Sequence, residues 1–203
     1  MHHDAEEIRA ILDREAEAIR NIPVNGEFDR AVQLIYERVH QGGGKIISSG
    51  MGKAGHVANH IATTLSSTGS PALFIHPSEA QHGDLGIIRQ NDLLLLLSNS
   101  GRTREIIELV ELTRALYASI PVILITGNPE GELVKKSEVV LFTGHPDEVC
   151  PLGLTPTTSS TAMAVMGDVL VVLLMKKIRF TPEDYARRHH GGYLGQKSRG
   201  KTV

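Results

Sequence analysis

The strongest constraint on the fold is a series of five short apolar runs separated by stretches with helical spacing. Most of these runs are rich in β-branched residues or leucine, and they lie at 45–49, 72–76, 92–97, 121–126 and 139–142. Apolar residues at nearly every position predict strands buried on both faces, and strands that alternate with helices form parallel sheets. The sequence therefore predicts an α/β fold: a doubly wound, five-stranded parallel sheet of flavodoxin-like order. Such sheets bind ligands beyond the carboxyl ends of their strands.

Helical periodicity flanks the predicted sheet at both ends of the chain. Amphipathic segments at 4–22 and 27–40 precede the first strand, and Thr181-Pro-Glu-Asp184 has the pattern of a helix start. Further helices are predicted at 56–67, 103–117 and 158–177, with a short one around Leu133. No repeat or linker divides the chain. We therefore expect a single domain over residues 1–203, with N-terminal helices at 4–41 and a C-terminal helix and tail at 181–203.

Charge and cysteine content exclude several classes of protein. With 21 Lys and Arg against 23 Asp and Glu, the net charge of −2 argues against a nucleic-acid partner. No fully apolar run approaches the roughly 18 residues of a membrane helix, and the polar start lacks a signal-peptide core. We expect no membrane partner and a cytoplasmic location. The single cysteine, Cys150, is interpreted as a buried structural thiol, and no metal site is predicted because no Cys pair or His-Glu-x-x-His pattern is present.

Two glycine-containing loops follow predicted strands at the ligand-binding edge. Ser98-Asn-Ser-Gly-Arg-Thr103 supplies hydroxyls, a glycine and the N–H groups of a helix start, which suits an anion. An ordinary turn with a Ser or Thr helix cap has the same pattern. Gly50-Met-Gly-Lys-Ala-Gly55 only loosely resembles a dinucleotide fingerprint, because the second strand ends in His76-Pro77 rather than in an acidic residue. Lys53 opposes the helix dipole there, which favours a bound anion beside it.

Titratable side chains gather in the remaining loops. His82 lies between Glu79 and Asp84, Glu105 follows the Ser98 loop, and Glu148 precedes Cys150. A carboxylate can remove a proton alpha to a carbonyl, a neutral histidine can move a hydroxyl proton, and a cation can stabilise the resulting enediolate. Chain order does not show that these groups converge. His2, His3, His40, His60 and His145 are interpreted as ordinary surface or core residues.

Five motifs, in chain order, resemble the sugar isomerase (SIS) domain of D-arabinose 5-phosphate isomerases. They are Ser48-Ser-Gly-Met-Gly-Lys-Ala-Gly-His56, His76-Pro-x-Glu-Ala-x-His-Gly-Asp-Leu-Gly86, Ser98-Asn-Ser-Gly101 with Glu105, Cys150-Pro-Leu-Gly-Leu-Thr-Pro-Thr157, and His189 with Gly191-Gly-x-Leu-Gly195. The resemblance covers nearly the whole chain. It implies interconversion of D-ribulose 5-phosphate and D-arabinose 5-phosphate through an enediolate. That step feeds the synthesis of 3-deoxy-D-manno-octulosonate (Kdo) for lipopolysaccharide or capsule.

The same resemblance implies roles for individual residues. The family's catalytic set falls on Lys53, Glu105, Glu148 and His189, with either glutamate as the base. Substrate and phosphate binding fall on Gly52, Ser98, Asn99, Ser100, Gly101 and Thr103, together with His82, which a neighbouring subunit could supply. Family members are tetrameric, so a homotetramer is implied. The reaction is redox-neutral, so no cofactor is expected.

The sequence departs from the family pattern at three places. His190 stands where proline is common, so two adjacent histidines compete for the acid–base role, and Arg102 adds a second cation beside the phosphate loop. Many relatives continue into CBS modules, whereas this sequence ends at Val203. We therefore expect any feedback by CMP-Kdo, a later intermediate, to act at the pocket itself. The alternatives are a non-catalytic sugar-phosphate sensor and an isomerase of another sugar phosphate.

Overall fold

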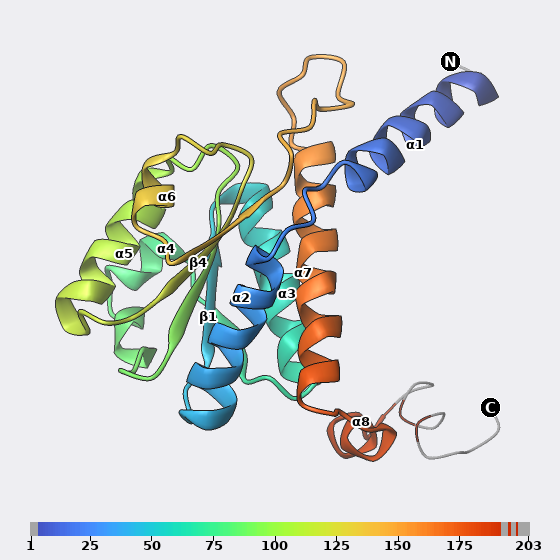
Figure 1. Ribbon diagram of the computed structural model, residues 1–203. Coiled ribbons are helices and arrows are strands. Elements are labelled where there is room, and N and C mark those ends of the chain that lie inside the picture. The colour runs from blue at the N-terminus through green and yellow to red at the C-terminus, as the bar shows by residue number, and fades with distance from the viewer. Residues whose placement is uncertain (1–3, 192–194, 196–197, 199–203) are drawn as a thin grey trace.

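A computed structural model describes residues 4–191, 195 and 198 of the chain. Its five strands form one parallel sheet with the spatial order β2-β1-β3-β4-β5, and helices cover both faces (Figure 1). The strands are β1 Ile46–Gly50, β2 Ala72–Phe74, β3 Leu93–Leu97, β4 Val122–Thr126 and β5 Val139–Phe142. The predicted doubly wound, flavodoxin-like α/β fold is confirmed, and each strand overlaps its predicted run.

The helices follow the predicted pattern, with two differences. They are α1 Ala5–Arg20, α2 Glu27–Ile35, α3 Gly52–Ser67, α4 Pro77–Ala80, α5 Arg104–Leu116, α6 Glu132–Lys135, α7 Thr158–Lys177 and α8 Pro182–Arg188, with a π-helical turn Tyr36–Gln41 after α2. First, α3 begins at Gly52 rather than at His56. Second, the segment after β2 forms α4 and a 3-10 turn, Asp84–Ile87, where we expected a loop. Pro77 occupies the first turn of α4, where its fixed φ favours a helix start. The predicted tail lies outside the described residues beyond Gly191, apart from Gly195 and Ser198.

Side-chain alternation along the strands divides the core into two layers. Leu93, Leu95 and Leu97 of β3 pack on one face with α2, α3 and α7, whereas Leu94 and Leu96 pack on the other with α5. All five leucines are fully buried. Successive strand residues point to opposite faces, so a strand covered on both sides must be apolar throughout. This is why a run of leucines forms the central strand here.

The helix α7 corrects one expectation from the sequence. Thr158–Lys177 is long enough to span a membrane, with a mean hydropathy of 1.7 in its most apolar window. The helix itself is predicted, but its Ser, Thr and Gly residues interrupt the apolar run, which is why no run of membrane-spanning length is expected from the sequence. In the fold, α7 packs along α3 and buries Ala162, Met166 and Leu170 in the larger core layer (Figure 1). That packing is the environment of a core helix.

The strand order places a crevice between β1 and β3. From β1 the chain crosses through α3 to β2 on one side, and from β3 it crosses through α5 to β4 on the other. Gly50 and Leu97, the last residues of β1 and β3, are paired in register. The loops that follow them, at 51–55 and 98–103, therefore lie on either side of the topological switch point, where such folds bind ligands.

The close packing of α7 on α3 depends on Gly167. A Cβ atom built on Gly167 would overlap the side chain of Ile61 in α3. We expect Gly167→Val to lower the free energy of unfolding by about 2–3 kcal/mol, measured by urea denaturation, because the interior is overpacked. Adding Ile61→Ala should recover part of that loss. Strictly additive losses would mean that the two side chains do not compete for the same space.

Candidate active site

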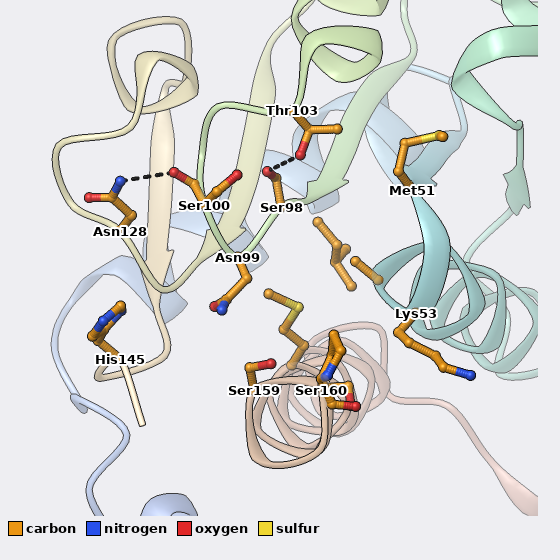
Figure 2. A pocket seen from close by; sticks show the side chains of 14 residues that line it. Met51, Lys53, Ser98, Asn99, Ser100, Thr103, Asn128, His145, Ser159 and Ser160 are labelled. Carbon is orange, nitrogen blue, oxygen red and sulfur yellow. Dashed lines mark hydrogen bonds between the residues drawn. The ribbon is translucent and has the colours of Figure 1, made fainter. Parts of the chain in front are cut away.

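A pocket of about 470 Å³ opens at the carboxyl ends of the strands, within the range of small-ligand sites (Figure 2). One wall is formed by the loop after β3, and the opposite wall by the first turns of α3 and α7. None of the described residues that line the pocket is acidic. The lining residues are Met51, Lys53, Ala54, Leu97, Ser98, Asn99, Ser100, Thr103, Asn128, His145, Pro156, Ser159, Ser160 and Met163. The wall therefore favours an anionic ligand.

The loop 98–103 is held with its carbonyl groups turned away and its amides available. The Asn99 carbonyl accepts a hydrogen bond from the Gly127 N–H (3.1 Å), and the Ser100 carbonyl accepts one from the Asn128 side chain (2.9 Å). The N–H groups of Asn99, Ser100 and Thr103 donate no hydrogen bond within the described residues. The Ser98 and Thr103 hydroxyls bond to each other at 2.8 Å across the loop (Figure 2). Free amides and hydroxyls at the start of α5 make an anion cradle.

Gly101 gives this loop its shape. Its φ of +61° lies in the left-handed region that favours glycine, and a Cβ atom there would stand 2.9 Å from Gly131 Cα. The Gly101 carbonyl accepts a hydrogen bond from the Leu133 N–H at 3.0 Å. Gly101 therefore lets the loop after β3 rest directly on the backbone that follows β4. Gly101 itself is buried and does not reach the pocket wall.

Lys53 lies on the pocket wall in the first turn of α3. The preceding Gly52 adopts a φ of +57° and shapes the turn, but it does not line the pocket. The Lys53 side chain is exposed, and Figure 2 shows its ammonium group directed away from Ser98 and Ser100. Lys53 makes no salt bridge within the described residues. Its long side chain can rotate to bring the ammonium group toward a negatively charged ligand.

Glu148 lies behind the pocket wall, at the start of α7. Its carboxylate accepts hydrogen bonds from the Thr157 N–H (2.7 Å), the Thr157 hydroxyl (2.9 Å) and the Ser159 N–H (3.3 Å). Partial burial opposes the charged form, but the hydrogen bonds from Ser159 and Thr157 outweigh it and lower the pKa of Glu148. The Arg14 side chain of α1 also donates to the Glu148 carbonyl at 3.1 Å. In this chain Glu148 caps a helix whose first turn lines the pocket.

The lowered pKa of Glu148 predicts a pH dependence of stability. A carboxyl group whose pKa is lower in the folded state stabilises the fold above its unfolded pKa, and this contribution disappears as the pH falls through the folded value. We expect wild type to lose stability in urea melts between about pH 5 and pH 3, and Glu148→Gln to lose less over that range. At neutral pH the substitution should cost about 1–2 kcal/mol, as for a lost helix cap. The exposed neighbour Asp147 gives the control, because Asp147→Asn should change neither quantity. Equal pH profiles for wild type and Glu148→Gln would contradict the prediction.

Three further predicted residues surround the pocket without lining it. Glu105 lies in the first turn of α5, directly after the loop 98–103, and makes no hydrogen bond through its side chain within the described residues. Arg102 is exposed on the loop, and its N–H donates to the Ser100 hydroxyl at 3.2 Å. His82 is exposed on the turn after α4, away from the pocket wall.

His189 and His190 lie at the far end of the molecule. They follow α8, which begins after α7 has ended, whereas the pocket is lined by the first turn of α7 (Figure 1). A helix of 20 residues, such as α7, is about 30 Å long. The His189 ring stacks on Tyr185 with centroids 3.7 Å apart, and its Nδ1 bonds to the Tyr185 carbonyl at 3.0 Å. Within one chain His189 therefore does not meet Lys53.

Four polar residues of the pocket were not predicted. Ser159 and Ser160 begin α7, for which the sequence indicates only a buried helix, and Asn128 and His145 follow β4 and β5. Two signals in the sequence point to them. The Ser- and Thr-rich stretch 155–161 opens a helix after a strand, and residues after β4 and β5 fall at the same sheet edge as the phosphate loop. His145, interpreted from the sequence as an ordinary surface or core residue, is exposed and lines the pocket.

Cys150 also differs from the expected buried thiol. It is partly exposed in the loop before α7. Hydrogen bonds from the Thr155 side chain and from backbone N–H groups, including that of Leu154, lower its pKa to about 6. A lowered pKa favours the thiolate form of Cys150. Among the described residues, no group of three or more His, Cys, Asp and Glu side chains is placed to hold a metal ion.

Comparison with known proteins places this pocket in a family. The model of the SIS domain matches residues 41–173. Arabinose 5-phosphate isomerase KdsD of Yersinia pestis is 46% identical over 186 residues, which is 92% of this chain and 55% of that protein. The chain thus spans about half the length of the curated relatives it matches.

Two solved structures agree with the fold over almost their whole length. A candidate phosphosugar isomerase involved in capsule formation from Bacteroides fragilis is 58% identical, with a TM-score of 0.91, and the match covers 93% of this chain and 98% of that one. An Escherichia coli CFT073 protein in complex with A5P is 30% identical, with a TM-score of 0.83, over 90% and 95% of the two chains. With this match in sequence and in fold, the chain belongs to the SIS domain family.

Proposed function

We propose that the protein is an aldose–ketose isomerase that interconverts D-ribulose 5-phosphate and D-arabinose 5-phosphate. The observation that carries the proposal is the loop 98–103, whose unpaired amides and whose hydroxyls border a pocket with Lys53 and no acidic wall residue among those described. Such a loop holds the phosphate of a sugar phosphate. The similarity to arabinose 5-phosphate isomerases and to a protein in complex with A5P supports the choice of substrate.

The reaction needs two proton movements and no change in oxidation state overall. A base removes the proton from C2 of the aldose, the electrons form a C1–C2 double bond, and O1 becomes an oxyanion. The base then delivers a proton, which can exchange with solvent while the base holds it, to C1, while a second proton moves from O2 to O1, which leaves the ketose. In this proposal Glu105 or Glu148 serves as the base, Lys53 stabilises the oxyanion, and His189 moves the hydroxyl proton. Because the substrate loses no electrons, no cofactor is needed.

The proposed active site requires a homo-oligomer, for which we propose a tetramer. Lys53 and the phosphate loop share one pocket, whereas His189 and His82 lie outside it, so a neighbouring subunit would supply these histidines. Exposed apolar side chains offer the contact. Ile8, Ile11 and Leu12 form an apolar stripe on α1, and Leu152 and Leu154 are 76% and 78% exposed in the loop before α7. Figure 1 shows α1 and this loop projecting from the same end of the body. Such contiguous apolar groups favour association.

Other parts of the proposal follow from this assignment. Residues 1–203 would act as one SIS domain in the cytoplasm, with a sugar phosphate and no nucleic acid as partner. Feedback by CMP-Kdo would act at the same pocket, since that ligand also carries phosphate and sugar groups. Calorimetric titration with CMP-Kdo should therefore show binding that D-arabinose 5-phosphate displaces. Binding that the substrate leaves unchanged would place the feedback site elsewhere.

An isomerase assay across pentose and hexose phosphates in deuterated water tests the proposed function. We expect conversion of D-arabinose 5-phosphate, with solvent deuterium entering at C2 through the enediolate. Turnover of a hexose phosphate in preference to the pentose would make the protein a different isomerase. Tight binding without conversion or exchange would indicate a sugar-phosphate sensor.

A further inference from the structure

His145 is a pocket residue to which the proposed reaction assigns no role. It follows β5 and lines the pocket beside Asn99 and Asn128 (Figure 2). Its Nδ1 lies 2.9 Å from the carbonyl oxygen of Gly127, at the end of β4. A carbonyl oxygen can only accept, so Nδ1 must carry the hydrogen. In the neutral ring this bond fixes Nε2 as an acceptor.

The backbone of His145 is held in a conformation that is costly for a side chain of this kind. Its φ is +54°, in the left-handed region, and within the described residues only Arg179 shares this property among non-glycine residues. Gly144 before it also has a positive φ, of +85°. A glycine at position 145 would adopt this conformation without cost. Strained residues of this kind cluster at ligand sites, where the side chain repays the strain.

His145 and Asn99 are fixed on the same residue, Gly127. The Gly127 N–H donates to the Asn99 carbonyl at 3.1 Å, while the Gly127 carbonyl bonds to His145. A Cβ atom at Gly127 would overlap the Asn99 Oδ1 atom, so only glycine allows this packing. The Asn99 Oδ1 atom is buried and has no hydrogen-bond partner within the described residues. The pocket wall thus combines the fixed His145 ring with the Asn99 side chain, whose Oδ1 atom accepts no hydrogen bond from the described residues.

From this geometry we infer that His145 binds a hydroxyl group of the sugar chain, through a hydrogen bond that the hydroxyl donates to Nε2. The inference rests on the proposed function and adds a residue that determines specificity for the sugar. Because Nε2 is an acceptor, it can bind the hydroxyl groups of the sugar but not the phosphate group. A phosphate dianion offers only acceptors, which would face the lone pair of Nε2, whereas every sugar hydroxyl offers a donor. His145 therefore binds the sugar chain, and the loop 98–103 binds the phosphate.

Calorimetric titration of two ligands, D-arabinose 5-phosphate and inorganic phosphate, tests this role. For His145→Gly and His145→Asn, whose backbones tolerate the left-handed region, we expect about 3- to 10-fold weaker binding of the sugar phosphate. Binding of inorganic phosphate should stay unchanged. Arg179→Gly is the matched control, because it relieves the same backbone strain (φ +54°) at the far end of α7 and should leave both affinities as they are.

Nitrogen-15 NMR of the wild-type imidazole gives an independent measurement. We expect the Nε2 signal of the neutral His145 ring to shift with D-arabinose 5-phosphate but not with inorganic phosphate. Equal weakening of both ligands in the variants would assign His145 to the phosphate and overturn the inference, as would unchanged binding of the sugar phosphate. If the wild type itself fails to bind D-arabinose 5-phosphate, the proposed function fails first, and the two failures are thereby distinguished.

Discussion

Glu105→Gln is expected to lower kcat for D-arabinose 5-phosphate by about 10²- to 10⁴-fold, the contribution of a general base. Two glutamates compete for this role, and their surroundings differ. The Glu148 carboxylate accepts three hydrogen bonds at the start of α7, which lower its pKa and weaken it as a base. Glu105 follows the phosphate loop directly, and its side chain makes no hydrogen bond within the described residues. These differences are the reason that we expect Glu105 to be the base.

Comparing kcat of the two glutamine variants, Glu105→Gln and Glu148→Gln, tests which glutamate is the base. Glu105→Gln should keep its affinity for D-arabinose 5-phosphate, measured by calorimetry, because the loop 98–103 is unchanged. Glu148→Gln should lose stability and retain more of its kcat than Glu105→Gln. Glu111→Gln, on the exposed side of the same helix α5, is the control and should turn over normally. If Glu148→Gln is the more severely impaired variant in kcat, the base is Glu148 and the assignment is reversed.

The sheet could be predicted from the sequence because its determinants are local. Most strands are apolar nearly throughout, as Leu93–Leu97 shows most clearly, and the turns after β1, β3 and β4 contain glycine. The segment after β2 was harder to predict. Its single-turn helix α4 and 3-10 turn depend on Pro77 and on the packing of α4 against α5. Such packing cannot be predicted from the periodicity of a short segment. The start of α3 at Gly52 was missed because glycine is a poor helix former.

In the candidate site, too, the residues that are close in the chain could be predicted from the sequence, whereas those brought together by the fold could not. The loop 98–103 is recognisable because the residues proposed to bind an anion are contiguous in the chain. Ser159 and His145 come from other loops and meet it only through the strand order. The resemblance to the family identifies Glu148 as a candidate catalytic residue. The structure adds that the Glu148 carboxylate caps α7, a contact that depends on how residues 148 and 157–159 pack together. No single-chain pattern can indicate which residues a second copy would contribute.

Mixing two inactive variants, Lys53→Ala and His189→Ala, is expected to restore activity. In one chain Lys53 shares a pocket with the first turn of α7, whereas His189 follows α8, beyond the other end of α7, a helix about 30 Å long. If the site takes Lys53 from one subunit and His189 from another, each variant alone has no complete site. After joint unfolding and reassembly, random mixing makes about a quarter of the sites complete, so activity should return to about that fraction of wild type.

A second mixture shows whether the recovery comes from shared sites. Lys53 and Ser98 line the same pocket of one chain, so every site built from Lys53→Ala and Ser98→Ala subunits lacks one of them. That mixture should remain inactive. Recovery in both mixtures would mean that the variants repair each other by another route, such as stabilisation. Recovery in neither would mean that Lys53 and His189 do not meet across subunits, so that the groups of the active site come from one chain. The paired result thus separates a site shared between subunits from one completed within a single chain.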